Sequence, residues 1–183
     1  MKKKILFIFI AILSLTMTVN AKEVTSDLKL TEDITTGIHI PEGKEVVLDL
    51  NNHKISGVID NYATIYNEGT LTIKGNGEVS NDYSEATDPS LILNKGTITI
   101  ENGKYSGGAY NLLNEGKATI KGGSFTRTGG TTIAIQNNKT LSITNITVQG
   151  QVISNNSITI KDGTFNAGVR ITKKGTIKGG NFK

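Results

Sequence analysis

Short blocks of alternating apolar and polar residues recur along most of this chain. The clearest block, Gly116 to Phe125, reads Gly-Lys-Ala-Thr-Ile-Lys-Gly-Gly-Ser-Phe. Alternation with a period of two predicts a strand with one buried face, and the glycine pair predicts a tight corner after it. Similar blocks begin at Val47, Gly69, Gly96, Lys139, Ser157 and Gly175. Recurrence of one such unit predicts stacked turns of a solenoid rather than one closed core.

Each block offers three apolar positions at nearly fixed offsets, while the connections between blocks vary in length. The main strand carries Leu50, Ile73, Ile100, Ile120, Ile143, Ile160 and Ile177. A second set follows the corner: Ile55, Val79, Tyr105, Phe125, Val148, Phe165 and Phe182. A third set precedes the main strand: Ile65, Ile92, Leu112, Ile135, Val152 and Val169. We therefore expect a three-sided coil whose parallel strands stack about 4.8 Å apart.

Polar residues recur at the two kinds of corner. One kind carries pairs that tolerate a positive φ: Asn102-Gly103, Gly122-Gly123, Asp162-Gly163 and Gly179-Gly180. The other kind carries Asn67, Asn94, Asn114, Asn137 and then Ser154. Amide side chains at equivalent places in successive turns are predicted to form a hydrogen-bonded ladder with a structural role.

These patterns predict an all-β protein, a single-stranded right-handed parallel β-helix of about seven short rungs over residues 43–183. A left-handed coil is the alternative, but its strict six-residue period is missing here. Residues 22–42 alternate without following the repeat, and we expect them to form an N-terminal cap over the open end of the coil.

The pattern Asn-x-Gly-x-Leu/Ile-Thr-Ile-x-Gly-Gly-x-Phe, with Ile40-Pro-Glu-Gly-Lys44 ahead of it, resembles secreted bacterial right-handed β-helix proteins of the pectin-lyase-like fold. The resemblance covers about residues 40–183 and implies that fold. Its polysaccharide lyases use clustered acids, calcium and a base, and its hydrolases use grouped aspartates. This chain has scattered acids and only two arginines, Arg127 and Arg170. The run from Arg170 to Lys173 matches the substrate clamp of the polygalacturonase-like members too weakly to predict that activity.

The chain opens with Lys2 to Lys4 and an apolar run from Ile5 to Val19, which predicts a signal peptide over residues 1–21 and export. A membrane anchor is the alternative, but this run is shorter than the roughly 20 residues that cross a bilayer. The net charge of the whole chain is only +4, and three of its lysines lie in this leader. We therefore expect no basic surface that could bind nucleic acid. The chain has no cysteine, which excludes disulfides and thiol chemistry.

Candidate site residues are few. The insert at residues 81–90 places Asp82, Tyr83, Glu85 and Asp88 close together, a weak candidate for calcium binding or sugar stacking that lacks a calcium-loop motif. Candidate glycan contacts are Tyr83, Lys121, Lys161, Arg170 and Lys178. His39 and His53 have no partner at metal-ligand spacing and are predicted to be solvated or capping side chains. We expect no cofactor.

Hydroxyl side chains mark the outward positions of the main strands, among them Thr70, Thr72, Thr97 and Thr99. A flat hydroxyl array resembles the faces of ice-binding solenoids, although threonine is also a favoured residue on solvent-facing strands.

The sequence favours a secreted or cell-surface, non-enzymatic module of structural or adhesion type. The alternatives are a carbohydrate-active or glycan-binding protein and, further off, an ice-binding one. Expected partners are a polysaccharide or host surface, without nucleic acid or a stable membrane anchor. The repeat runs to Lys183, so end-to-end self-association through the C-terminal rung, or a longer natural protein, is also expected.

Overall fold

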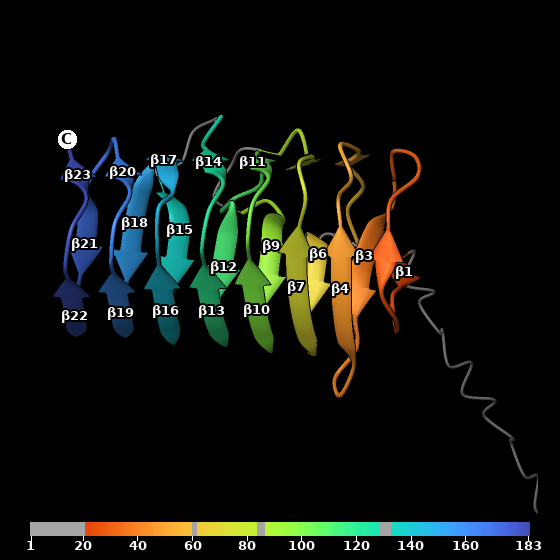
Figure 1. The fold of residues 1–183 in the computed structure, drawn as a ribbon, viewed down its shortest axis with the longest axis horizontal. Helices are drawn as coiled ribbons and strands as arrows, with labels where there is room; N and C mark the ends of the chain where they lie inside the picture. Colours follow the sequence, from red (N-terminus) through yellow and green to blue (C-terminus); the bar gives the residue numbers. More distant parts are fainter. Residues whose placement is uncertain (1–20, 60–61, 84–86, 129–132) are drawn as a thin grey trace, which may run out of the picture.

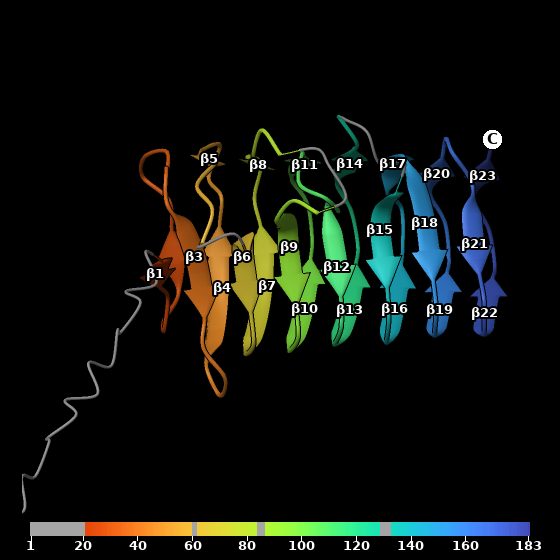
Figure 2. The ribbon, with the colours of Figure 1, turned by 180° about the vertical axis from the view of Figure 1, so that it is seen from behind.

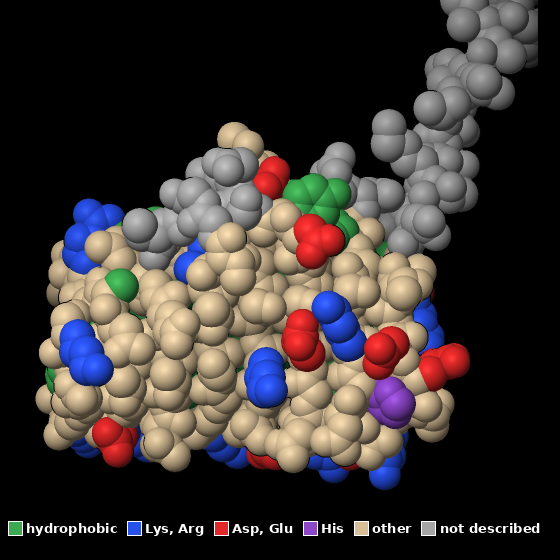
Figure 3. Space-filling view, turned by 90° about the horizontal axis from the view of Figure 1, so that it is seen from above, with side chains coloured by type: hydrophobic (Ala, Val, Ile, Leu, Met, Phe, Trp, Pro, Cys, Tyr) green, Lys and Arg blue, Asp and Glu red, His purple; other side chains and the backbone are tan. Residues whose placement is uncertain are grey.

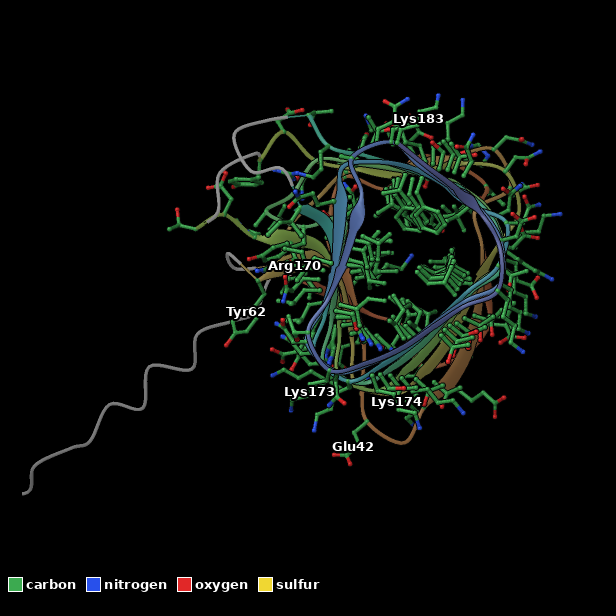
Figure 4. The ribbon with its side chains drawn as sticks, turned by 90° about the vertical axis from the view of Figure 1, so that its left-hand side faces the viewer. Glu42, Tyr62, Arg170, Lys173, Lys174 and Lys183 are labelled. Atoms are coloured by element: carbon green, nitrogen blue, oxygen red, sulfur yellow. The ribbon has the colours of Figure 1, made fainter. Side chains whose placement is uncertain are left out.

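The computed structural model describes residues 21–59, 62–83, 87–128 and 133–183. In these residues the strands form three parallel sheets that wind around one axis (Figure 1). Figure 4 looks along this axis from the C-terminal end. The chain comes toward the viewer anticlockwise, from Arg170 past Lys174 to Lys183, so the coil is right-handed. The predicted parallel β-helix is confirmed, with about eight turns against the seven expected.

Each turn gives one strand to sheet A, one to sheet B and, from the second turn on, one to sheet C. Sheet A, seen as a row in Figure 2, consists of β1 (Ala21–Glu23), β3 (Gly37–Ile40), β6 (Ala63–Asn67), β9 (Ser90–Asn94), β12 (Leu112–Asn114), β15 (Ile133–Asn137), β18 (Gln151–Ser154) and β21 (Val169–Ile171). Sheet B consists of β2 (Leu28–Lys29), β4 (Glu45–Asp49), β7 (Thr70–Lys74), β10 (Thr97–Ile100), β13 (Lys117–Ile120), β16 (Thr140–Ile143), β19 (Ser157–Ile160) and β22 (Lys174–Ile177). Sheet C consists of β5 (Lys54–Ile55), β8 (Glu78–Ser80), β11 (Lys104–Ser106), β14 (Ser124–Thr126), β17 (Thr147–Gln149), β20 (Thr164–Phe165) and β23 (Asn181–Phe182).

The interior of the coil is filled by the three predicted apolar columns. Ile120 pairs with Ile100 on one side and Ile143 on the other, and all three side chains are fully buried. In sheet C, the rings of Tyr105 and Phe125 stack with their centroids 4.7 Å apart. Each fully buried aliphatic or aromatic side chain stabilises the fold by roughly 1.5–3 kcal/mol, so the columns replace the single core of a globular domain.

Both corners adopt the expected structures. Gly103 and Gly123 have φ values of 120° and 106°, a region that disfavours residues with a side chain. At the other corner, buried asparagine side chains form a continuous ladder. The Nδ2 atoms of Asn67, Asn94 and Asn114 each donate to the next Oδ1 at 2.7 Å, and that of Asn137 donates to the Ser154 hydroxyl at 2.8 Å.

The N-terminal segment differs from the expected cap. β1 pairs in parallel with β3, β2 pairs with β4, and Ile34 bridges to Ile55. In the described residues, the segment expected as a cap therefore supplies a first turn and the start of the second. This segment keeps the apolar alternation of the later turns but lacks their asparagine and paired-glycine corners. The sequence pattern therefore does not reveal that its strands pair with β3 and β4.

The register of the second turn also corrects the sequence alignment. Leu48, not Leu50, pairs with Ile73. Leu50 is equally buried because it lies past the strand end, where it packs against the glycines of the next corner. Leu48 and Leu50 both point inward and lie two residues apart. The alternation of apolar and polar residues therefore fits the pairing of either leucine with Ile73.

Candidate functional site

Two hollows meet at the corner between sheets B and C. The first has a volume of about 300 Å³ and is lined by Asp33, Asn52, His53, Lys54, Asn76, Gly77, Glu78 and Lys104. The second has a volume of about 540 Å³ and is lined by Asn76, Gly77, Asn102, Gly103, Lys104, Gly123 and Ser124. They share Asn76, Gly77 and Lys104, and so form one depression along the axis of the coil, which we name the corner groove.

Glycines line the floor of the corner groove. Gly77, Gly103 and Gly123 stand in successive turns at the start of the sheet C strands. A Cβ atom built on Gly103 would lie 2.9 Å from the Tyr105 hydroxyl, and one on Gly123 would lie 2.9 Å from the Gly103 carbonyl oxygen. Any larger residue here would therefore disturb the corner.

The sheet B side of the groove carries exposed amides. Asn102 Nδ2 donates to Asn76 Oδ1 at 2.8 Å, so the two side chains are stacked on successive turns. An amide offers two donors and two acceptor lone pairs, and this single bond leaves most of them available.

The sheet C side carries charges that alternate in sign. Lys54, Glu78 and Lys104 are in-register partners on successive strands, and Lys54 Nζ lies 3.3 Å from Glu78 Oε1. His53 Nδ1 lies 3.4 Å from Asp33 Oδ1. Further along, the same column is uncharged, with Ser124, Thr147, Thr164 and Asn181. Figure 3 shows this face, with paired red and blue side chains near the N-terminal end.

The electrostatics of Glu78 favour its ionised form. The neighbouring Ser80 hydroxyl, and then the ammonium groups of Lys54 and Lys104, lower the pKa of Glu78 in spite of partial burial. A carboxyl that acts as a general acid near neutral pH needs a raised pKa instead. The groove therefore suits hydrogen bonding better than proton donation.

The predicted basic residues of the main strand lie along one edge of the coil, at the ends of the sheet B strands. Lys121 follows β13 and pairs with Glu101 across 3.1 Å, and both precede groove residues in the chain. Lys161 and Lys178 continue this edge as exposed side chains at equivalent places. The structure therefore brings these three lysines onto one ridge, although Lys161 and Lys178 lie beyond the lined part of the groove.

The other predicted candidates lie elsewhere. Tyr83 is 39% exposed in the loop after β8, and Arg170 is exposed on the outer face of sheet A (Figure 4). Asp82 is exposed and Asp88 is half-buried, whereas Glu85 lies outside the described residues. In the part of the chain that the structure describes, no group of three or more histidine and acidic side chains is placed to hold a metal ion.

A cluster on the outer face of sheet A was not predicted. His39 and Tyr66 are in-register partners, and their rings stack with centroids 5.0 Å apart and planes 13° apart. Tyr62 also stacks on Tyr66, with centroids 5.8 Å apart and planes 29° apart. The sequence alternation could have indicated this cluster. His39 follows the inward Ile38 and Tyr66 follows the inward Ile65, so both side chains belong to one outward column.

Hydrogen bonds connect the side chains of this cluster. The Tyr66 hydroxyl donates to Glu68 Oε1 at 2.5 Å, and His39 Nε2 lies 3.0 Å from Glu68 Oε2. The Lys95 ammonium lies 5.3 Å from the Tyr66 ring centroid. Burial and then the Glu68 contact raise the pKa of Tyr66, while the hydrogen bond from Tyr66 lowers the pKa of Glu68. Proximity to Tyr66 also raises the pKa of Lys95.

The outward hydroxyl residues of sheet B form one long column. Thr72, Thr99 and Thr119 are in register, and the column continues through Ser142, Thr159 and Thr176. The neighbouring column is interrupted by Lys117 and Lys174. The regular array is therefore present, and ice binding by it stays a prediction.

Comparisons with known proteins add no assignment. No family model, no curated protein and no solved structure matches this chain. Within the described ranges, no helix is long and apolar enough to span a membrane. The likeness to pectin-lyase-like proteins thus stays a resemblance in sequence pattern, and the functional argument rests on the surfaces described above.

Proposed function

We propose that the protein is a secreted or cell-surface module of structural or adhesion type, without enzymatic activity, that makes its contact along the corner groove. Export is inferred from the leader at residues 1–21. The observation that carries the proposal is the run of the groove along the coil axis, where equivalent residues recur in successive turns. A site that repeats along a solenoid suits a long, repetitive ligand better than a single small molecule.

The chemistry of the groove favours a polysaccharide with little net charge. Hydroxyl groups can pair with the amides of Asn76 and Asn102, which both donate and accept. The charges of Lys54 and Glu78 largely offset each other. Electrostatic attraction of a charged polymer is therefore not the main contribution to binding. The affinity should depend only weakly on the salt concentration.

The alternative is a carbohydrate-active protein. Hydrolysis needs two carboxyl groups with different roles, one of them with a raised pKa. The lowered pKa of Glu78 and the contact between Asp33 and His53 support binding without cleavage. Arg170, which matches the substrate clamp of the polygalacturonase-like proteins only weakly, lies on another face. Release of unsaturated product from polygalacturonate would favour the enzymatic alternative.

Self-association is the second part of the proposal. The last turn leaves Ile177 52% exposed and Phe182 40% exposed. Phe182 stacks on Phe165 with ring centroids 4.9 Å apart, so its other face is open. We propose that this turn stacks on a second copy, which would cover apolar surface and pair free strand edges.

Binding to an array of immobilised bacterial and host polysaccharides tests the proposal. The Asn76→Ala/Asn102→Ala double variant should lose most of the wild-type signal. The Asn138→Ala/Asn155→Ala double variant is a matched control, because it removes another stacked amide pair, 3.1 Å apart, at a different corner. Equal losses in both variants, or no wild-type binding to any polysaccharide, would contradict the proposal.

A further inference from the structure

The Tyr62 side chain is unusual on this surface. Apart from Ile177 and Phe182 in the last turn, Tyr62 and Tyr83 are the exposed large hydrophobic side chains in the described part of the chain, and Tyr62 is 56% exposed. An exposed aromatic ring offers apolar area that a ligand can cover.

The backbone holds Tyr62 in place. Its amide donates to the Ile59 carbonyl oxygen at 2.5 Å, and the Ile59 amide donates to the Ala63 carbonyl oxygen at 2.8 Å. Ile59 is 2% exposed and packs so tightly on Gly37 that a Cβ there would lie 2.5 Å from its side chain. The backbone at Tyr62 is therefore held against sheet A and needs little ordering when a ligand arrives.

Tyr62 also has a fixed support. It stacks on Tyr66, whose other contacts are the ring of His39 and the ammonium of Lys95. The hydroxyl of Tyr66 and the ring of His39 are both held by Glu68. An aromatic ring backed in this way keeps one orientation, as a stacking platform requires.

Hydrogen-bonding groups surround this platform and are only partly used. A carboxylate has about four acceptor positions, and Glu68 uses two of them on Tyr66 and His39. The Lys95 ammonium has three donors and is exposed. Beside Glu68 lies a hollow of about 320 Å³ between the β3–β4 loop and the next two turns, lined by Gly43, Lys44, Glu45, Glu68, Gly69, Thr70, Gly96 and Thr97.

We propose that this tyrosine cluster binds an uncharged pyranose ring, with Tyr62 stacked on the C–H face of the sugar and Glu68 and Lys95 bonded to its hydroxyl groups. The carboxylate and the ammonium group match the hydroxyl groups at the edge of a sugar ring, and the aromatic ring matches its apolar C–H face. The two carboxylates of Glu23 and Glu68 outnumber the ammonium of Lys95 in this cluster, which disfavours sugar acids. The site lies on sheet A, away from the corner groove, and the inference does not depend on ligand binding there.

Saturation-transfer NMR with methyl glycosides of glucose, galactose and N-acetylglucosamine tests the proposal, with methyl glucuronate for comparison. At least one neutral glycoside should receive saturation, mainly on the protons of one ring face. Tyr62→Ala should weaken its binding by about tenfold or more, as expected for loss of an anchoring aromatic side chain. Tyr62→Phe should retain binding, and Lys95→Ala should weaken it.

Two controls separate this site from other surfaces. Tyr83→Ala removes the other exposed tyrosine and should leave binding unchanged, as should Asn138→Ala/Asn155→Ala, which removes a stacked amide pair outside the cluster. Equal binding by wild type and Tyr62→Ala would overturn the proposal, and so would absence of saturation for every neutral glycoside, the result expected if the cluster docks a protein instead. Neither result bears on the groove, whose variants are scored on polysaccharides.

Discussion

Asn94 donates from its Nδ2 atom to Asn114 Oδ1 across 2.7 Å, and both side chains are fully buried. The same Nδ2 also approaches the carbonyl oxygens of Gly96 and Lys117, at 3.3 and 3.2 Å. One amide thus closes its own corner and bonds to the turn above. The ladder therefore couples neighbouring turns through buried hydrogen bonds.

Removing one amide from this ladder should destabilise the coil. Asn114→Ala takes away the acceptor of Asn94 and a donor to Asn137, at a cost of about 1–3 kcal/mol for each buried polar group left without a partner. Urea unfolding measures this. Asn114→Ser should cost less, because serine already fills the equivalent place at Ser154. Destabilisation no greater than that of the exposed variant Asn166→Ala would contradict the structural role of the ladder.

The inward direction of Ile120 can be tested against its neighbour. Ile120→Asp would place an unpaired charge in the apolar column, at a cost of about 3–5 kcal/mol. Thr119→Asp introduces the same charge one residue earlier, on the outward face, and should cost less than about 1 kcal/mol. Thermal unfolding of the two variants should therefore differ widely. Similar melting temperatures would show that the register is wrong.

The Tyr66–Glu68 hydrogen bond predicts a dependence on pH. Because the folded pKa of Glu68 is lowered, its contribution to stability is present above the unfolded pKa of about 4.3 and is lost as the pH falls through the folded value. Tyr66→Phe removes the main cause of the shift, so the pKa of Glu68 should rise toward the usual value. Carbon-13 NMR titration of the Glu68 carboxyl group measures it. An unchanged midpoint in Tyr66→Phe would contradict the assignment.

Self-association should depend on the apolar edge of the last turn. Sedimentation velocity over a concentration series should show assembly of the chain without its leader, and Ile177→Lys should reduce it by placing a charge among the apolar contacts. Thr176→Lys adds the same charge on the outward face of the same strand and should have little effect. A monomer at every concentration, or equal effects of the two substitutions, would count against stacking through this end.

The sequence predicted the coil because each turn repeats the same inward positions, so that Ile120, Phe125 and Leu112 could be assigned to three sides before the structure was known. Repetition also revealed the asparagine ladder. The pattern failed where it was ambiguous, at Leu48 and Leu50, and where the corner signature was missing, before Pro41.

The surfaces were harder to predict than the interior. The contact between His39 and Tyr66 depends on the register across a long connection, which the alternation of each strand leaves undefined. The corner groove depends on the path of the chain at Gly103 and Gly123, which have positive φ values, and on the stacking of Asn76 against Asn102. The sequence showed the lysines along one edge of the coil but not the corner groove.

The claim that the corner groove is the contact surface is tested most directly by filling it. Ser124 and Thr164 lie on one outward column of sheet C, and only Ser124 lines the groove. For the array polysaccharide that binds wild type most strongly, surface plasmon resonance should show Ser124→Trp weakening binding by about tenfold or more, while Thr164→Trp retains it. Equal affinity in the two variants, whether kept or lost, would contradict the account.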